Sequence, residues 1–318
     1  MSINNNKKLE ESRKIWATTR SHLEADRLKY KRSGKKSKSH WSLFEKVLQF
    51  FLIFIKFFNI YKRGYQNAKN IKVNKIDLYF PDLPCSFENY KILHLSDLHI
   101  DSIQGLEDII CEKLNGLEYD LCVLTGDYRK SCQGSLKTIL RPMKKLTDCI
   151  NANDGIYAIL GNHDTYLMAE YEDKIDVKLL INETVFIKRG NDKIAVTGTD
   201  DPFYYFTDRA IIALDEDINC FKIALVHTPE LYDVAAENGY NLYLCGHTHG
   251  GQICLPGGIP IITHQFEGRK FYKGLWKHNS ITGYTSCGCG VSGIPLRFYC
   301  QGEITIFSLR KGEADKIL

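Results

Sequence analysis

The stretch "LYLCGHTHGGQ", residues 242–252, places two histidines one residue apart directly after a short apolar run. His247 and His249 stand in a glycine-rich turn, where the backbone can come close to other groups. An imidazole in such a place is a buried hydrogen-bonding side chain, a proton carrier or a metal ligand. The ends of the other apolar runs help to decide between these roles.

Four further apolar runs also stop at polar residues. They are "YKILHLSDLH" (90–99), "DLCVLTGDY" (120–128), "GIYAILGNHD" (155–164) and "KIALVHTPE" (222–230). The ends of strands gather at one edge of a sheet, so residues far apart in sequence can meet there. Together the five ends carry Asp97, His99, Asp127, Asn162, His163, Asp164, His227, His247 and His249.

Helix-like stretches lie between several of these runs, at 106–117, 134–151, 165–180 and 231–238. Strands that alternate with helices predict a layered α/β domain with largely buried sheets. Residues 183–200 have the pattern of a hairpin that turns at 189–192, and residues 281–309 favour further strands.

The order of these motifs is D-x-H, G-D, G-N-H-D, a single H and G-H-x-H. It resembles the signature of the calcineurin-like metallophosphoesterase superfamily, over about residues 90–309 and with no position substituted. The resemblance implies an α-β-β-α sandwich that holds two metal ions at the edge of its sheets.

The resemblance also assigns a role to each motif residue. The first metal would be held by Asp97, His99 and His249, the second by Asn162, His227 and His247, and both by a bridging Asp127. His163 would stabilise or protonate the leaving group, with Asp164 orienting its ring. Imidazole and oxygen ligands without thiolate suit two divalent ions, which we expect to be Mn²⁺, with Fe or Zn²⁺ as alternatives. Such a pair clamps a phosphate and activates water.

Charge divides the chain into two parts. Residues 1–64 carry 16 Lys and Arg against 5 Asp and Glu, whereas the remainder is acidic. We expect residues 1–40 to be a basic, disordered arm and residues 65–318 to be the metallophosphoesterase domain. The apolar and aromatic residues of 41–64 predict an amphipathic helix lying on an anionic membrane surface. A spanning helix, or one packed on its own domain, are the alternatives.

The compartment follows from the same features. The first 40 residues lack the apolar core of a secretory signal. We therefore expect a peripheral protein on the cytoplasmic face of the inner membrane, with a single-pass membrane protein as the alternative. The eleven cysteines show no zinc-finger spacing and are interpreted as reduced core residues of a cytosolic protein.

Two stretches of sequence indicate which branch of this superfamily the chain resembles. "GHTHGGQICLPGG" (246–258) and "GCGVSGIPLRFYCQGEITIFSL" (288–309) are similar to a membrane-associated phosphodiesterase branch. That branch includes the LpxG-type UDP-2,3-diacylglucosamine pyrophosphatases, which release UMP and lipid X in lipid A biosynthesis. The chain departs from it at Gln301-Gly302, where the branch often has two prolines. The other hypotheses are a general phosphodiesterase or phosphatase, and a non-catalytic membrane-attached scaffold.

Three residues are candidates for substrate contacts. Tyr204 and Tyr205 belong to the aromatic run of "DDPFYYFTD" (200–208), which either grips acyl chains, stacks on uracil or plugs the core. Arg297 either meets a phosphate oxygen or is an exposed surface residue. We expect a lipid-linked or small phosphodiester substrate and no obligate protein partner. Nucleic acid is not expected, because the acidic body would repel a duplex.

Overall fold

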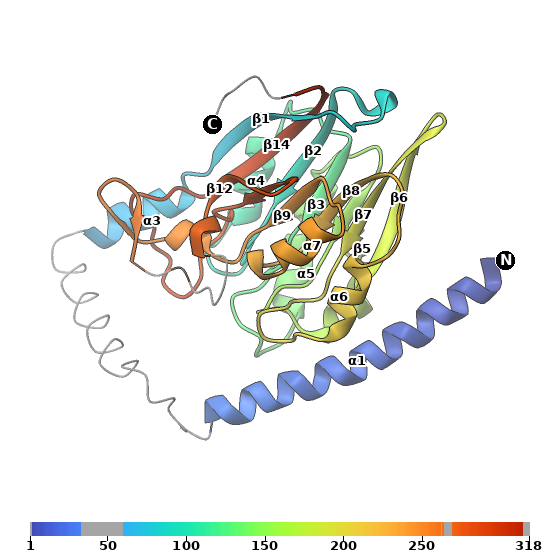
Figure 1. Cartoon of the computed structure of the whole chain (residues 1–318). Coiled ribbons are helices and arrows are strands. Elements are labelled where there is room, and N and C mark those ends of the chain that lie inside the picture. Colours follow the sequence, from blue (N-terminus) through green and yellow to red (C-terminus); the bar gives the residue numbers. More distant parts are fainter. Residues whose placement is uncertain (1, 33–59, 262, 264–268, 314–318) are drawn as a thin grey trace.

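The computed structural model describes residues 2–32, 60–261, 263 and 269–313 (Figure 1). The first of its two large sheets has the order β1-β14-β2-β3-β4-β5, with bounds Lys72–Phe80, Glu303–Lys311, Tyr90–Leu95, Leu121–Leu124, Ile156–Ala158 and Lys178–Leu179. The second has the order β12-β13-β9-β8-β7-β6, with bounds Gly274–His278, Ile281–Thr285, Leu242–Cys245, Phe221–Leu225, Asp192–Gly198 and Glu183–Arg189. A small third sheet pairs β10 (Cys254–Leu255) with β11 (Ile259–Pro260).

The central strands of each large sheet run parallel. Strands β2 to β5 are parallel in the first sheet, as are β13, β9, β8 and β7 in the second. The hairpin predicted at 183–200 is confirmed, because β6 and β7 pair antiparallel and Arg189 faces Asp192 at the turn. Parallel neighbours bring their carboxyl ends to one edge, where the polar ends of the apolar runs lie.

Apolar side chains hold four layers together. The two sheets face each other across a core that includes Ile92, Val123, Ile223 and Leu244. Helices α4 (Leu106–Leu114) and α5 (Lys137–Asp148) pack on the outer face of the first sheet. Helices α6 (Asp208–Leu214) and α7 (Tyr232–Glu237) cover the second. In α5 the buried Ile139, Met143 and Leu146 are spaced by four and three residues, which gives the helix one apolar face. This is the expected α-β-β-α sandwich.

The helix expected at 165–180 is wrong in its second half. A short 3₁₀ helix, η2 (Tyr166–Tyr171), is followed by β5. Lys178 and Leu179 pair with Tyr157 and Ala158 of β4. Hydrogen bonding to this neighbouring strand makes residues 178–179 a strand instead of a further helical turn. The other 3₁₀ helices are η1 (Cys85–Phe87), η3 (Pro229–Leu231), η4 (His249–Gly251) and η5 (Arg269–Phe271).

The N-terminal segment differs most from expectation. Residues 2–32, predicted to be disordered, form helix α1 (Ser2–Arg32), which lies along one side of the sandwich (Figure 1). Its inward face contains Trp16 and Arg20, only 6% and 1% exposed. The reason is that this face buries Arg20 through hydrogen bonds and, of its described side chains, places only Trp16 and Ala17 against the apolar core, so apolar periodicity does not reveal it. Residues 33–40 lie outside the described part of the chain.

The membrane helix predicted at 41–64 falls mostly outside the described residues, which resume at α3 (Ile60–Lys69). A Cβ atom on Gly64 would lie 2.6 Å from the ring of Phe298, so the bare glycine lets α3 pack closely here. Among the described residues, no helix has both the length and the apolar character that a membrane crossing needs.

One pair of cysteines corrects the expectation of reduced thiols. Cys111 of α4 and Cys149, just after α5, form a disulfide between two neighbouring outer helices. Their Cα atoms lie 5.6 Å apart, within the range that a disulfide spans. The other nine cysteines are free, and six of them are buried.

Candidate metal centre

The polar ends of β2, β3, β4, β8 and β9 converge on one edge of the sandwich. Five residues there have left-handed backbone although none is glycine, with φ between 35° and 72°: Asp97, His99, Asp127, His247 and His249. Each such conformation costs roughly 1–3 kcal/mol and persists only where surrounding structure imposes it. These strained turns aim the side chains of separate loops at one point.

Glycines allow the loops to approach each other. A Cβ atom on Gly246 would lie 1.9 Å from Ser96 Oγ and 2.2 Å from Asp97 Oδ2. One on Gly161 would lie 2.3 Å from Asp127 Oδ1. Neither position accommodates a side chain, which explains the glycine that precedes the histidines in G-H-x-H and the asparagine in G-N-H-D.

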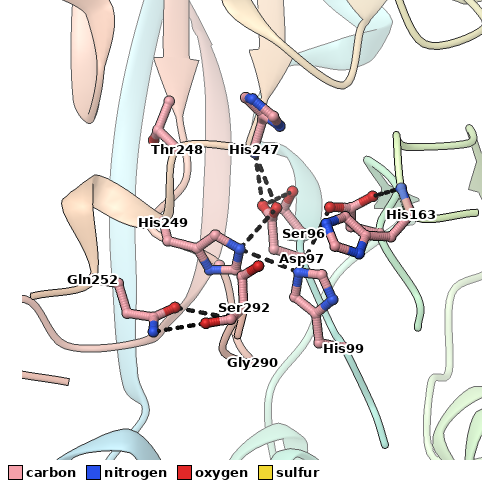
Figure 2. A network of polar contacts seen from close by, with 12 residues as sticks. Ser96, Asp97, His99, His163, His247, Thr248, His249, Gln252, Gly290 and Ser292 are labelled. Carbon is pink, nitrogen blue, oxygen red and sulfur yellow. Dashed lines mark hydrogen bonds and ion pairs between the residues drawn. The ribbon is translucent and has the colours of Figure 1, made fainter. Parts of the chain in front are cut away.

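The first candidate group joins Asp97, His99 and His249, whose ligand atoms lie within 4.8 Å of one another. Nε2 of His99 is 3.2 Å from Nε2 of His249, which in turn is 3.5 Å from Asp97 Oδ1 (Figure 2). His99 Nδ1 donates to the carbonyl of Arg129 at 2.8 Å, so its Nε2 presents the lone pair. The main-chain N–H of His247 donates to the Asp97 carboxylate at 2.9 Å and holds it in place.

The second candidate group joins Asp127, His227 and His247. Asn162 belongs with it, because its Oδ1 lies 2.9 Å from His247 Nδ1 and 3.1 Å from His227 Nε2. Oδ2 of Asp127 is 3.5 Å from Nε2 of His227 and 3.6 Å from Nε2 of His99, which belongs to the first group. Asp127 therefore stands between the two groups, at the place predicted for a bridging ligand.

Electrostatics favour a cation at the first group. Burial lowers the pKa of His99 to about 4, and burial beside His99 also holds the pKa of His249 well below its usual value. Both imidazoles are therefore neutral near pH 7 and offer lone pairs. Burial would raise the pKa of Asp127, but His227 and then His163 hold it well below the usual range.

Neutral imidazole nitrogens and carboxylate oxygens, with no thiolate among them, fit divalent ions such as Mn²⁺, Fe²⁺ or Zn²⁺. When bound, two such ions supply the Lewis acidity that polarises a phosphoryl oxygen and activates water. The seven predicted ligands lie together as this chemistry requires, and their assignment as ligands stays a prediction.

His163 adjoins the first group without joining it. Its ring meets that of His99 edge to face, with centroids 5.1 Å apart (Figure 2). Its Nδ1 donates to the carbonyl of Lys130 at 2.7 Å, and its main-chain N–H donates to Asp127 Oδ1 at 2.7 Å. This arrangement leaves Nε2 for a proton transfer at the half-exposed side of the centre.

Asp164 does not orient that ring, contrary to the prediction. Its carboxylate accepts hydrogen bonds from the main-chain N–H groups of Asp127, Tyr128 and Gly161, at 2.8, 2.9 and 2.8 Å. It therefore ties the G-N-H-D loop to the loop of Asp127. The carbonyl of Lys130 orients the His163 ring instead.

Two of the three substrate candidates lie inside the protein. Arg297 is fully buried, and its Nη2 donates to the carbonyls of Cys287 and Gly290, each at 2.6 Å. It gathers main-chain carbonyls beneath the site and has no surface left for a phosphate. Tyr205 is only 1% exposed, whereas Tyr204 is 46% exposed.

Sequence reasoning missed the residues that complete the rim. Phe203 packs on His247, with ring centroids 4.4 Å apart. Arg20 and Arg27 of α1 lie over the rings of Tyr205 and Tyr204, at 3.5 and 3.7 Å from the ring centroids. The available signal was the spacing of Arg13, Arg20 and Arg27, since residues seven apart share one face of a helix.

The sandwich and the two donor groups at its edge define a metal-dependent phosphoester hydrolase. Residues 90–251 match the family described as calcineurin-like phosphoesterase, and the chain belongs to this family.

The curated relatives agree with this assignment. The chain is 30% identical over 270 residues to "Uncharacterized metallophosphoesterase YkoQ" of Bacillus subtilis, covering 81% of this chain and 96% of the relative. It is 32% identical over 239 residues to "Uncharacterized metallophosphoesterase YkuE" of the same organism, covering 72% and 82%. It is 28% identical over 236 residues to "Phosphodiesterase YaeI" of Escherichia coli, covering 69% and 82%.

Proposed function

We propose that this enzyme hydrolyses a phosphodiester or pyrophosphate bond with two divalent metal ions, with Mn²⁺ as the expected metal. The observation that carries this proposal is the position of Asp127, whose carboxylate lies between both donor groups. A carboxylate shared by two ions fixes their separation, and paired ions serve an in-line displacement at phosphorus.

A residue beside the metal centre, His163, donates a proton to the leaving group. Lys130 O holds Nδ1–H of His163, so Nε2 is the atom that gives a proton to the departing oxygen. Asp164 keeps the loop of His163 against that of Asp127 through two main-chain hydrogen bonds, and a third, from Gly161, closes its own loop. Phe203 and Tyr204 form an aromatic wall beside His247, against which an apolar or aromatic part of the substrate packs.

The specific substrate that we propose is UDP-2,3-diacylglucosamine, cleaved to UMP and lipid X. Its support is the resemblance of residues 246–258 and 288–309 to the LpxG-type branch, together with an aromatic wall on which uracil stacks. The structure removes Arg297 and Tyr205 from this argument, because both are buried. A general phosphodiesterase is the second candidate, favoured by the similarity to a protein called a phosphodiesterase.

We further propose that residues 41–64 hold the enzyme on the cytoplasmic face of an inner membrane, near a diacyl substrate. The support is the sequence pattern of apolar residues flanked by lysine and arginine. A spanning helix remains the alternative, and extraction of the full-length protein from vesicles by high salt distinguishes a peripheral protein from a spanning one.

The test compares two substrates with one purified full-length enzyme. We expect Mn²⁺-dependent release of UMP from UDP-2,3-diacylglucosamine, and hydrolysis of bis(4-nitrophenyl) phosphate beside it. Cleavage of the chromogenic diester alone would refute the lipid substrate and retain the general phosphodiesterase. Failure of both, in protein that binds two equivalents of metal, would refute catalysis and favour a scaffold.

A further inference from the structure

Helix α1 is anchored beside the metal centre by buried polar contacts. Arg20, which is 1% exposed, forms an ion pair with Asp200 through Nη1. Its Nη2 donates to the carbonyls of Gly161 and Asp164, at 3.0 and 3.1 Å. Nε1 of Trp16 donates to the other oxygen of Asp200 at 2.7 Å. The helix is therefore fixed to both ends of the G-N-H-D loop.

Two turns further along, the same face of α1 carries Arg27 to the rim of the centre. Its Nη1 donates to the main-chain carbonyl of Asn162, a predicted ligand of the second metal, and to the hydroxyl of Tyr205 at 2.8 Å. Its guanidinium lies 3.7 Å above the centroid of the Tyr204 ring. One edge of the guanidinium is thus held, and its plane is set by an aromatic face.

The charge of Arg27 is not neutralised as that of Arg20 is. Arg20 is paired with Asp200 and also with Glu24. No ion pair between described residues includes Arg27, and its Nε and Nη2 have no hydrogen-bond partner within that part of the chain. A partly buried cation with unused donors therefore stands beside a site built for phosphoryl chemistry.

We propose that Arg27 and Tyr204 form a second anion subsite, which binds a non-reacting phosphate adjacent to the phosphorus that is attacked. A guanidinium fork matches two oxygens of a phosphate, and a positioned plane loses little entropy on binding. The substrate class is then a pyrophosphate-linked compound rather than a simple phosphodiester. This inference rests on the proposed function, because it takes the metal centre as the place of hydrolysis.

The test measures binding rather than turnover. Metal-loaded full-length protein is titrated calorimetrically with UDP and with UMP, at one buffered concentration of free metal ion. We expect the wild-type protein to bind UDP roughly tenfold more tightly than UMP, because only UDP offers the second phosphate. Arg27→Gln should weaken UDP roughly tenfold and change UMP less than threefold. Arg27→Lys keeps the charge without the fork and should fall between.

Matched variants separate the subsite from the docking of the helix. Arg13→Gln makes the same change on the same face of α1, but Arg13 pairs with Glu172 and Glu183, not with a residue of the centre. Lys14→Gln removes an exposed charge from the same helix. Neither should alter the preference for UDP, and thermal melting checks that each variant is folded.

Several outcomes would overturn the subsite. They are equal affinities of wild-type protein for UDP and UMP, equal weakening of both by Arg27→Gln, and an equal effect of Arg13→Gln. If Arg27→Gln does not fold, an Arg27→Lys variant with the full wild-type preference refutes the fork. Hydrolysis of bis(4-nitrophenyl) phosphate by the same preparations tests the proposed function separately: no hydrolysis with an intact preference for UDP refutes catalysis and supports the subsite.

Discussion

The predicted ligand cluster and the α1 interface are both buried and polar, yet they arise in opposite ways. The predicted ligands follow the ends of five strands, so short local patterns place them at the shared edge. The partners in the α1 interface are instead 135 to 184 residues apart in sequence. Sequence motifs therefore predict the ligand cluster. They do not predict the α1 interface, because its partners come together only when the chain has folded.

Their charges differ as well. In the ligand cluster, lone pairs of neutral imidazoles face one another across 3.2 Å and face a carboxylate, an arrangement that favours an added cation. At the core of the α1 interface, the guanidinium of Arg20 already meets the carboxylate of Asp200. The first region is arranged to bind and react, whereas the pair of Arg20 and Asp200 in the second holds a helix in place.

The largest effect should come from breaking the ligand cluster at its centre. Asp127→Asn removes the carboxylate between the two groups, so we expect activity to fall by roughly 10³-fold or more, with loss of at least one metal equivalent. Rate and metal content measured together check this. Asp120→Asn makes the same change near the start of β3, away from the centre, and should keep both metals and most activity. Two metal equivalents and normal turnover in Asp127→Asn would refute the bridge.

The next effect should separate chemistry from metal binding within the cluster. His163→Ala should retain both metals and lose roughly 10²–10⁴-fold in rate on diesters with alkyl leaving groups. Nitrophenyl leaving groups need little protonation and should lose much less. Rates for a graded series of leaving groups provide the measurement. An equal loss across the series, or a loss of metal, would show that His163 is a ligand or a structural residue.

A third change tests whether the α1 interface is as structural as its paired charges indicate. Arg20→Ala leaves the buried Asp200 without its cation, which should lower the free energy of unfolding by about 3–5 kcal/mol. Urea denaturation measures this. Adding Asp200→Asn should restore part of the loss, since the uncompensated charge is then gone. If the losses in unfolding free energy from Arg20→Ala and Asp200→Asn simply add in the double variant, the ion pair itself contributes nothing to stability.

The smallest effect is expected from a substitution outside both the ligand cluster and the α1 interface, which serves as a reference. Replacing Cys111 and Cys149 by serine opens a covalent loop with a sequence separation of 38, so stability should fall by at most about 4 kcal/mol. Because neither cysteine contacts the ligand cluster, turnover of a chromogenic diester should not change. A loss of turnover in folded protein would link the outer helices to the centre.

The sequence contained enough to place the sheets, the hairpin and the cluster, because each depends on a pattern a few residues long. Asp164 and Arg297 show where such reasoning stops. Both are polar residues in motif-rich loops, but their partners are main-chain groups of other loops. Only the packed loops decide whether such a side chain faces the substrate or the backbone.

Helix α1 shows a second reason why part of the structure could not be predicted from the sequence. Amphipathic patterns reveal helices that bury an apolar face, whereas α1 buries arginines and a tryptophan against carboxylates and carbonyls. Its composition is that of a solvated arm, but acceptors on distant loops bind its polar side chains and Trp16 packs in the apolar core. Nothing in the sequence around Asp200 indicates that it forms an ion pair with Arg20.

The anchoring of α1 by Asp200 also sets an order of events during translation. Trp16 is synthesised 184 residues before the carboxylate that receives its indole N–H. At roughly 5–20 residues per second, that interval is on the order of ten to forty seconds. All the strands of the first sheet except β14 are synthesised within it. Helix α1 is thus secured to Asp200 only after β1 to β7 have been synthesised, and until then the nascent chain presents its arginines to the surrounding water.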